Sequence, residues 1–281
     1  MQFRTIVSID KPTFQIDPLE PMLFVGSCFA DSIGRRFAEE RFPATVNPYG
    51  VMYNPASVLH TVECWLSGSI VSQPSSTERA DSRVCPCRIA FLTLGTNHIY
   101  RLRETGEIVD NCQKRPQLLF QEEELSVSEC VGYLSKAVEA LRQYNNGMHV
   151  IITVSPIRYR KYGFHGSQLS KATLLLAADE LTKKYPYMTY FPAYEIVLDE
   201  LRDYRFYQPD MLHPSEQAVE YIWERLVETF FSPRAKEFLS EWQPVKRALA
   251  HRPFNPESPE YQHFLAETKQ KERELMEKYS A

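Results

Sequence analysis

The stretch MLFVGSCFADSIGRRF, residues 22–37, decides the predicted fold because an apolar run passes directly into an amphipathic helix. The run MLFVG has the length and composition of a fully buried strand, and helical periodicity follows over residues 30–40. Gly26 and Ser27 stand at the junction, where the amide groups of the helix N-terminus point back towards them. A core strand that leads at once into a helix is the building unit of parallel sheets, so we predict an α/β protein.

The rest of the chain repeats this order of strands and helices. Apolar runs predict three more core strands, and amphipathic patterns predict the helices between them. The predicted strands are CRIAFLTLGT (residues 87–96), HVIITVSP (149–156) and the first part of MTYFPAYEI (188–196), in which a short helix follows the strand. The predicted helices are NPASVLHTVECWLSG (54–68), SVSECVGYLSKAVEALRQY (126–144), LSKATLLLAADELTKKY (169–185) and EQAVEYIWERLVETFF (216–231). We therefore expect a three-layer α/β/α sandwich with a largely parallel sheet.

Two segments interrupt this pattern, and the end of the chain departs from it. The Ser-rich residues 67–83 are expected to form a surface loop, and HIYRLRETGEIVDN (98–111) alternates around Thr105 and Gly106, which predicts an inserted β-hairpin. Beyond Pro233 the chain contains two charged amphipathic helices and no further strand pattern. We therefore predict one α/β domain over residues 1–231 and a helical extension over 232–281, packed on or beside it.

Composition excludes several classes of function. The net charge is −4 and the basic residues are dispersed, so a nucleic-acid partner is not expected. No stretch is apolar enough to span a membrane, and the first twenty residues lack the apolar core of a signal peptide, which predicts a cytoplasmic protein. The six cysteines are scattered and are expected to be reduced thiols. Cys85 and Cys87 form the only close pair, and without a second ligand pair they make a poor zinc site, so no metal or other cofactor is expected.

Candidate catalytic residues follow the predicted strands, because reactive groups in an open parallel sheet collect at the carboxyl ends of its strands. Ser27 follows the first strand and is a candidate nucleophile, although a serine before a helix is more often only a helix cap. Asp210 and His213 have the spacing at which a carboxylate can orient an imidazole as a base for a serine. A capping aspartate beside a solvated histidine would show the same pattern. Cys28 ranks below Ser27, because a small buried thiol is the commoner role at its position.

Other polar residues near these strand ends are candidate auxiliaries. Asn47, Gly50, Asn54 and Asn97 could donate hydrogen bonds to an oxyanion or contact substrate, and each is also an ordinary turn residue. Arg158 could hold a substrate carboxylate or phosphate, and a structural ion pair explains it equally well.

Residues 26–30 spell Gly-Ser-Cys-Phe-Ala, and the chain resembles the GSCFA family, which is similar to the SGNH (GDSL-like) hydrolases. Further segments resemble the family in the same order and cover most of residues 20–230. They are NPYGVMYNP (47–55), TLGT (93–96), NCQKRP (111–116), SPIRY (155–159), SKATLL (170–175), YFPAYEI (190–196) and DELRDYRFYQPDMLHPS (199–215). Gln113 and Tyr159 stand where the family pattern leads us to expect histidine.

The resemblance implies a flavodoxin-like fold and an SGNH-type site. It makes Ser27 the nucleophile and Asp210 and His213 its partners, with an oxyanion hole from the amides of Ser27 and Gly50 and the side chain of Asn97. Asn47, Asn54 and Arg158 would then contact substrate. The implied function is a serine esterase acting on an O-acyl group, by analogy an acetyl group on a sugar. The alternatives are an O-acyltransferase with the same triad and a binding or scaffold protein without turnover. The sequence does not predict the oligomeric state.

Overall fold

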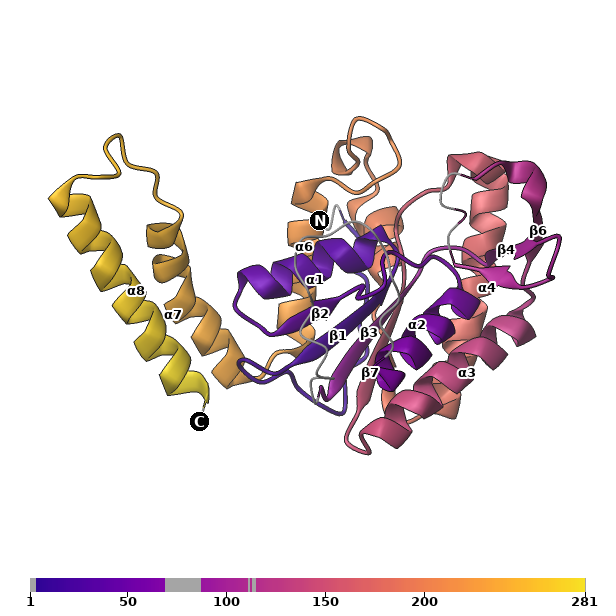
Figure 1. Ribbon diagram of the computed structural model, residues 1–281, viewed down its shortest axis with the longest axis horizontal. Coiled ribbons are helices and arrows are strands. Elements are labelled where there is room, and N and C mark those ends of the chain that lie inside the picture. The colour runs from indigo at the N-terminus through magenta and orange to yellow at the C-terminus, as the bar shows by residue number, and fades with distance from the viewer. Residues whose placement is uncertain (1–3, 69–86, 111, 113–114, 281) are drawn as a thin grey trace.

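The computed structural model describes residues 4–68, 87–110, 112 and 115–280. Its centre is a parallel sheet of five strands in the order β2-β1-β3-β7-β8 (Figure 1). These strands are β1 (Met22–Gly26), β2 (Ala44–Val46), β3 (Ile89–Leu94), β7 (His149–Val154) and β8 (Met188–Tyr190). The order of the parallel strands is that of flavodoxin-like folds. The predicted α/β/α fold is therefore confirmed.

Alternating side chains of the strands divide the core into two layers. Leu23 and Val25 of β1 pack with α2 (Pro55–Ser67), α3 (Val127–Tyr144) and α4 (Gly163–Lys184) on one face of the sheet. Met22 and Phe24 pack on the other face with α1 (Cys28–Glu39) and α6 (Glu216–Phe230). Figure 1 shows these two groups of helices on opposite sides of the sheet. Both faces are covered, which explains why the strands read as continuous apolar runs.

The inserted segment forms a second, antiparallel sheet in the order β5-β4-β6. The predicted hairpin is confirmed as β4 (His98–Leu102) paired with β5 (Ile108–Val109). The sequence did not predict β6 (Phe120–Glu124), which pairs with β4 along its whole length. Its sequence FQEEE shows no apolar alternation, because most of its side chains face solvent. A 3₁₀ turn, η1 (Gln117–Leu119), leads into it.

Two connections bring further residues to the carboxyl end of the sheet. After β7 the chain forms the 3₁₀ turn η2 (Arg160–Tyr162), and α4 begins at Gly163, six residues before the predicted start at residue 169. After β8 come the short helix α5 (Ala193–Glu195), the π-helix η3 (Ile196–Leu201) and the 3₁₀ turn η4 (Tyr204–Phe206). Ser215 then caps α6. The predicted loop of residues 67–83 and Cys85 lie outside the described residues, apart from Ser67 and Gly68 at the end of α2.

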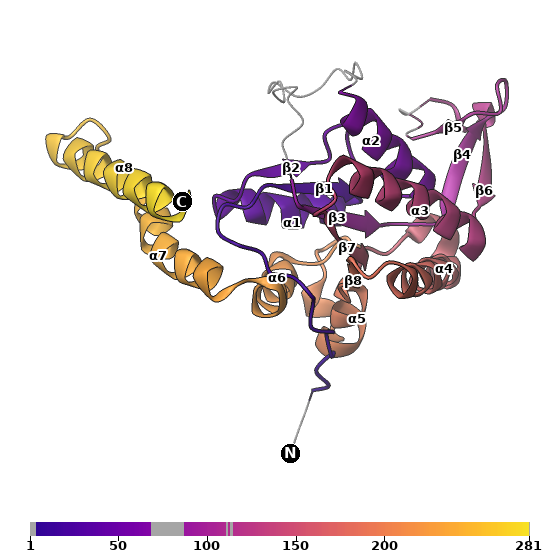
Figure 2. The ribbon, with the colours of Figure 1, turned by 90° about the horizontal axis from the view of Figure 1, so that it is seen from below.

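The C-terminal helices α7 (Pro233–Leu249) and α8 (Pro259–Ser280) pack against each other. They lie at the opposite end of the molecule from the inserted sheet (Figures 1 and 2). Phe238 and Trp242 of α7 and Tyr279 of α8 join the core layer that also contains α1 and α6. In the described part of the chain, no helix is long and apolar enough to cross a bilayer.

The fully buried carboxylate of Glu40 anchors α7 to the end of α1. It lies 2.8 Å from Lys246 Nζ and accepts a hydrogen bond of 2.8 Å from Gln243, and Arg36 pairs with it at 2.8 Å. We expect Glu40→Ala to lower the free energy of unfolding by about 2 kcal/mol, because Lys246 and Gln243 lose their nearest carboxylate and both cations keep only more exposed carboxylates. Urea unfolding measures the change.

The neighbouring Glu39 provides the matched control for this prediction. Its carboxylate is 58% exposed and lies 3.5–3.6 Å from the same two cations. Glu39→Ala is expected to cost less than about 0.5 kcal/mol, because exposed ion pairs contribute little. Equal losses in the two variants would contradict an anchoring role for Glu40.

Candidate active site

Ser27 lies where β1 ends and α1 begins. Its side chain caps the helix, because Oγ accepts a hydrogen bond of 3.3 Å from the backbone N–H of Phe29. The backbone N–H of Ser27 donates to the carbonyl oxygen of Thr93 on β3, at 3.1 Å. The residue is fully buried. The structure thus shows the helix cap that the sequence allowed, at the strand end where a nucleophile would also be expected.

Gly26 determines how closely this junction approaches the neighbouring strand. Its φ is 145°, and a Cβ atom there would lie 2.1 Å from the carbonyl oxygen of Thr93, so only glycine fits. Its N–H donates to Asn47 Oδ1 at 2.8 Å. Asn47 in turn donates through Nδ2 to Asp31 at 2.6 Å, and its carbonyl accepts from the N–H of Gly50 at 2.8 Å. Asn47 therefore holds in place the junction of β1 and α1 at which Ser27 lies.

Asp210 and His213 form the contact that their spacing suggested. His213 Nδ1 lies 2.6 Å from Asp210 Oδ2, while Asp210 Oδ1 accepts from the backbone N–H groups of His213 and Leu212 at 3.0 and 2.8 Å. The two backbone hydrogen bonds and the imidazole together lower the pKa of Asp210 to about 2. An ionised carboxylate can only accept, so Nδ1 carries the proton and Nε2 of the neutral ring is available as a base.

The loop that carries this pair is held by Arg158. Its backbone N–H donates to the carbonyl of Leu212 at 3.1 Å, and its guanidinium donates to the carbonyl of Met211 at 3.0 Å. The guanidinium also lies over the ring of Phe164, 4.0 Å from the centroid. These contacts position the loop, and a contact of Arg158 with substrate stays a prediction.

No hydrogen bond joins Ser27 to His213, both of which lie in the described part of the chain. The only hydrogen bond there to Ser27 Oγ comes from Phe29, and the imidazole of His213 bonds only to Asp210. The side chains of His213 and Asp210 are 40% and 41% exposed. The pairing of Ser27 with His213 therefore stays a prediction.

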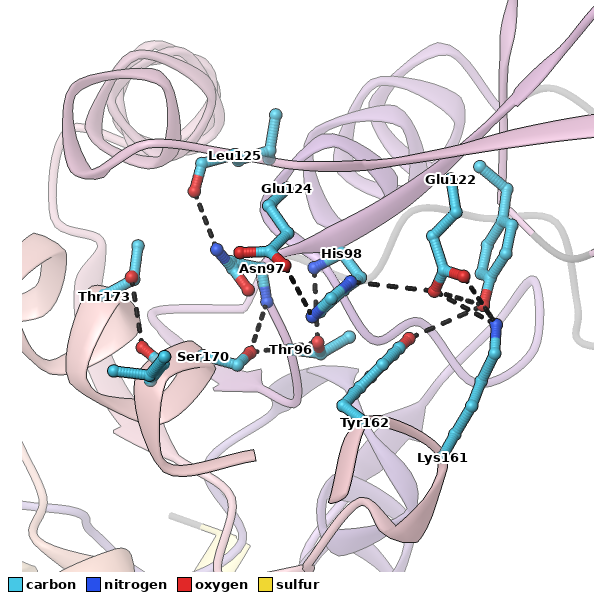
Figure 3. Close-up of polar contacts among 12 residues, drawn as sticks. Thr96, Asn97, His98, Glu122, Glu124, Leu125, Lys161, Tyr162, Ser170 and Thr173 are labelled. Carbon is cyan, nitrogen blue, oxygen red and sulfur yellow. Dashed lines mark hydrogen bonds and ion pairs between the residues drawn. The ribbon is translucent and has the colours of Figure 1, made fainter. Parts of the chain in front are cut away.

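The asparagine candidates occupy two different environments. Asn97 is buried, and its side-chain amide donates to the carbonyl of Leu125 at 2.8 Å (Figure 3). This contact gives no support to an oxyanion role for Asn97. Asn54 caps α2 through Oδ1, which accepts from Ser57 N–H at 2.9 Å, and the residue lines a cleft described below. Its Nδ2 has no hydrogen-bond partner among the described residues.

Lys171 is a buried charged residue at the carboxyl edge of the sheet that the sequence did not single out. It lies on α4, is completely buried, and donates from Nζ to the carbonyls of Gly95 and Ser155, both at 2.7 Å. These carbonyls follow β3 and β7 directly, so the ammonium ties two strand ends together. Burial lowers the pKa of Lys171 to about 7. The sequence contained a sign of this burial, because helical spacing places Lys171 on the buried face of α4. The same face includes Ser167, Ser170, Leu174, Ala177 and Leu181.

A cleft of about 630 Å³ opens between the inserted sheet, the start of α2 and the turn η2. Its lining residues are Tyr53, Asn54, Thr96, His98, Tyr100, Arg103, Asp110, Cys112, Arg115, Gln117, Phe120, Glu122, Tyr159, Lys161 and Tyr162. Ser27, Asp210 and His213 do not line it. Among the described residues, no group of three or more histidine, cysteine, aspartate or glutamate side chains could hold a metal ion.

Comparison with known proteins identifies the family. The sequence matches the GSCFA family over residues 21–84 and 72–226, and it matches the C-terminal domain of GSCFA domain proteins over residues 242–281. No curated protein matches the chain significantly.

Similar solved structures include three bacterial proteins. A candidate acylhydrolase from Bacteroides fragilis is 11% identical with a TM-score of 0.46, over 82% of this chain and 92% of that one. A candidate platelet activating factor from Streptococcus pneumonia is 16% identical with a TM-score of 0.44, over 76% and 85%. A family 3 carbohydrate esterase from Clostridium thermocellum is 11% identical with a TM-score of 0.41, over 83% and 100%.

Proposed function

This chain belongs to the GSCFA family, and we propose that it is a serine esterase that uses Ser27 as its nucleophile. The observation that carries the proposal is the pair formed by Asp210 and His213. An ionised carboxylate holds Nδ1 of the imidazole at 2.6 Å and leaves Nε2 as a base. Arg158 fixes the loop on which this pair sits. An orienting carboxylate, a base and a serine at a helix N-terminus are the components that acyl transfer requires.

The proposed reaction has two steps. Nε2 of His213 takes the proton of Ser27 as Oγ attacks the carbonyl carbon of the ester, and the imidazolium then gives this proton to the departing alcohol. Water, activated by the same imidazole, hydrolyses the acyl-serine and returns Ser27 to its starting state. An acceptor hydroxyl in place of water would make the protein an O-acyltransferase with the same residues. Because Ser27 Oγ caps α1 in this structure, the attack requires it to turn towards His213 when substrate binds.

Backbone amides are the proposed donors to the oxyanion. The N–H groups of Ser27 and Gly50 both donate to backbone carbonyls in this structure, so they must shift towards the substrate oxygen when it binds. The side-chain amide of Asn54 is a third donor without a present partner, and Asn54 replaces Asn97 in this role. The proposed substrate is an O-acyl, in particular O-acetyl, group of a carbohydrate.

A fluorophosphonate probe tests this function without knowledge of the substrate. We expect the wild-type protein to gain the mass of one adduct, and peptide mapping to place the adduct on Ser27, because a serine activated by a general base reacts much faster with this reagent than an ordinary hydroxyl. Intact-mass spectrometry provides the measurement. Cys28→Ala is the matched control at the adjacent position and is expected to label like the wild type.

Two results would argue against the esterase. The absence of any adduct on the wild-type protein would mean that Ser27 acts only as a helix cap, as in a binding or scaffold protein. An adduct mapped to another residue would mean that Ser27 is not the nucleophile.

A further inference from the structure

The cleft beside the inserted sheet combines aromatic walls with polar groups. The rings of Tyr53, Tyr100, Phe120, Tyr159 and Tyr162 line it. Tyr162 is stacked on the imidazole of His98, with ring centroids 3.6 Å apart and planes at 4° (Figure 3). Lys161 on the same turn bonds to Glu122 of β6 at 2.8 Å, so the wall formed by η2 is fixed to the inserted sheet. A cleft of about 630 Å³ has the size of a site for a small molecule.

Two lining residues connect the cleft to the proposed catalytic groups. The hydroxyl of Tyr53 lies 3.4 Å from the thiol of Cys28, the residue after Ser27. Tyr159 follows Arg158, which holds the loop of Asp210 and His213. The ring of Tyr53 meets that of Tyr159 edge to face, with centroids 6.1 Å apart. The inner wall of the cleft is therefore built from the segments that adjoin both the serine and the histidine.

The carboxylates that line the cleft already have partners, whereas two of its arginines do not pair with a carboxylate of any described residue. Asp110 lies 2.6 Å from the ring of His60, and Glu122 already bonds to Lys161 and Tyr100. Arg103 has no side-chain hydrogen bond or ion pair to any described residue. Arg115 contacts only the carbonyl of Cys112, at 3.4 Å, and the face of Phe120. Within the described chain, the guanidinium groups of Arg103 and Arg115 therefore have no carboxylate partner.

We propose that this cleft binds the alcohol part of the ester substrate, and that this part is a sugar carrying a carboxylate or a phosphate. The proposal rests on the esterase function proposed above. The aromatic faces pack against the sugar ring, and Arg103 and Arg115 bind its anionic group through the paired N–H donors that suit carboxylate and phosphate oxygens. The scissile ester then lies at the inner end, between Tyr53 and Tyr159.

Isothermal titration calorimetry with sugars that carry no ester tests this inference independently of turnover. Methyl β-glucuronide supplies a carboxylate, glucose 6-phosphate supplies a phosphate, and methyl β-glucoside is the neutral control. We expect at least one of the anionic sugars to bind about tenfold more tightly than the glucoside. The relative affinities of the two anionic sugars identify which anion the cleft takes.

Substitutions then place the binding site. Arg103→Ala is expected to weaken the anionic sugar about tenfold and to leave the neutral sugar unchanged. Arg101→Ala is the matched control on β4, because Arg101 pairs with Glu123 and does not line the cleft. Equal binding of all three sugars, binding of none, or equal effects of the two substitutions would overturn the inference. Arg103-dependent binding without a fluorophosphonate adduct would support the ligand class and refute the esterase.

Discussion

Replacing His213 by alanine is expected to slow the reaction of Ser27 with a fluorophosphonate by about a thousandfold at pH 7. The estimate follows from the role assigned to Nε2, because general-base catalysis contributes about 10²–10⁴-fold and the serine hydroxyl is a weak nucleophile without it. The second-order rate constant of adduct formation, followed by intact mass, measures the effect. Asp210→Asn should cause a loss of similar size, because an amide favours the wrong imidazole tautomer.

His165 provides the matched control for this substitution. It lies exposed on α4, and His165→Ala should leave the rate constant unchanged. A rate constant for His213→Ala within about threefold of the wild type would exclude His213 as the base. The pH profile adds a second check. The pKa of Asp210 is about 2, so this carboxylate is already ionised throughout the neutral range and should add no step to the profile between pH 4 and 9.

The sequence predicted four of the five strands of the central sheet because their information is local. It missed β2, which has only three half-buried residues and so shows no apolar run. The run MLFVG specifies β1, and the apolar face of the following residues specifies α1. Strands that are buried on both faces read as continuous apolar runs and are therefore easy to recognise. The third strand of the inserted sheet was missed for the opposite reason. The residues of β6 are mostly glutamates whose pairing with β4 depends on residues about twenty positions away.

The site shows the same division between local and distant information. The pair of Asp210 and His213 could be predicted because the two residues are only three positions apart, so the local backbone determines their geometry. The cleft could not be predicted, because Tyr53, Phe120 and Tyr159 meet only when α2, the inserted sheet and η2 are placed together. The contacts of Arg158 and Asn97 with backbone carbonyls were equally invisible, since nothing in a side chain's identity shows which distant carbonyl it will reach.

Lys171 should be more important for stability than any other lysine of α4. Its Nζ holds the carbonyls of Gly95 and Ser155 within the carboxyl edge of the sheet. A buried carbonyl that loses its partner costs about 1–3 kcal/mol, and removal of the desolvated ammonium offsets part of this loss at neutral pH. Either protonation state of the amine can satisfy both carbonyls, because even the neutral form carries two N–H groups.

We expect Lys171→Met to lower the free energy of unfolding by about 2 kcal/mol at pH 7, and the difference from the wild type to grow as the pH rises towards 9. The pKa of Lys171 is about 7 in the folded protein, whereas an unfolded lysine titrates near 10.4. Between about pH 7 and 10.4 the unfolded chain binds more protons at this lysine than the folded protein does. The free energy of unfolding of the wild type therefore rises with pH in this range, whereas that of the variant, which lacks the amine, does not. Urea unfolding at pH 7, 8 and 9 measures both.

Lys183→Met provides the matched control on the same helix. Lys183 is 74% exposed and pairs with Asp179 one turn earlier, so its substitution should cost less than about 0.5 kcal/mol at every pH. A Lys171→Met variant as stable as Lys183→Met would mean that the two strand ends hold their geometry without the amine. A loss that stays constant from pH 7 to 9 would mean that the ammonium remains charged throughout. The two hydrogen bonds to carbonyl oxygens would then outweigh burial in setting the pKa of Lys171.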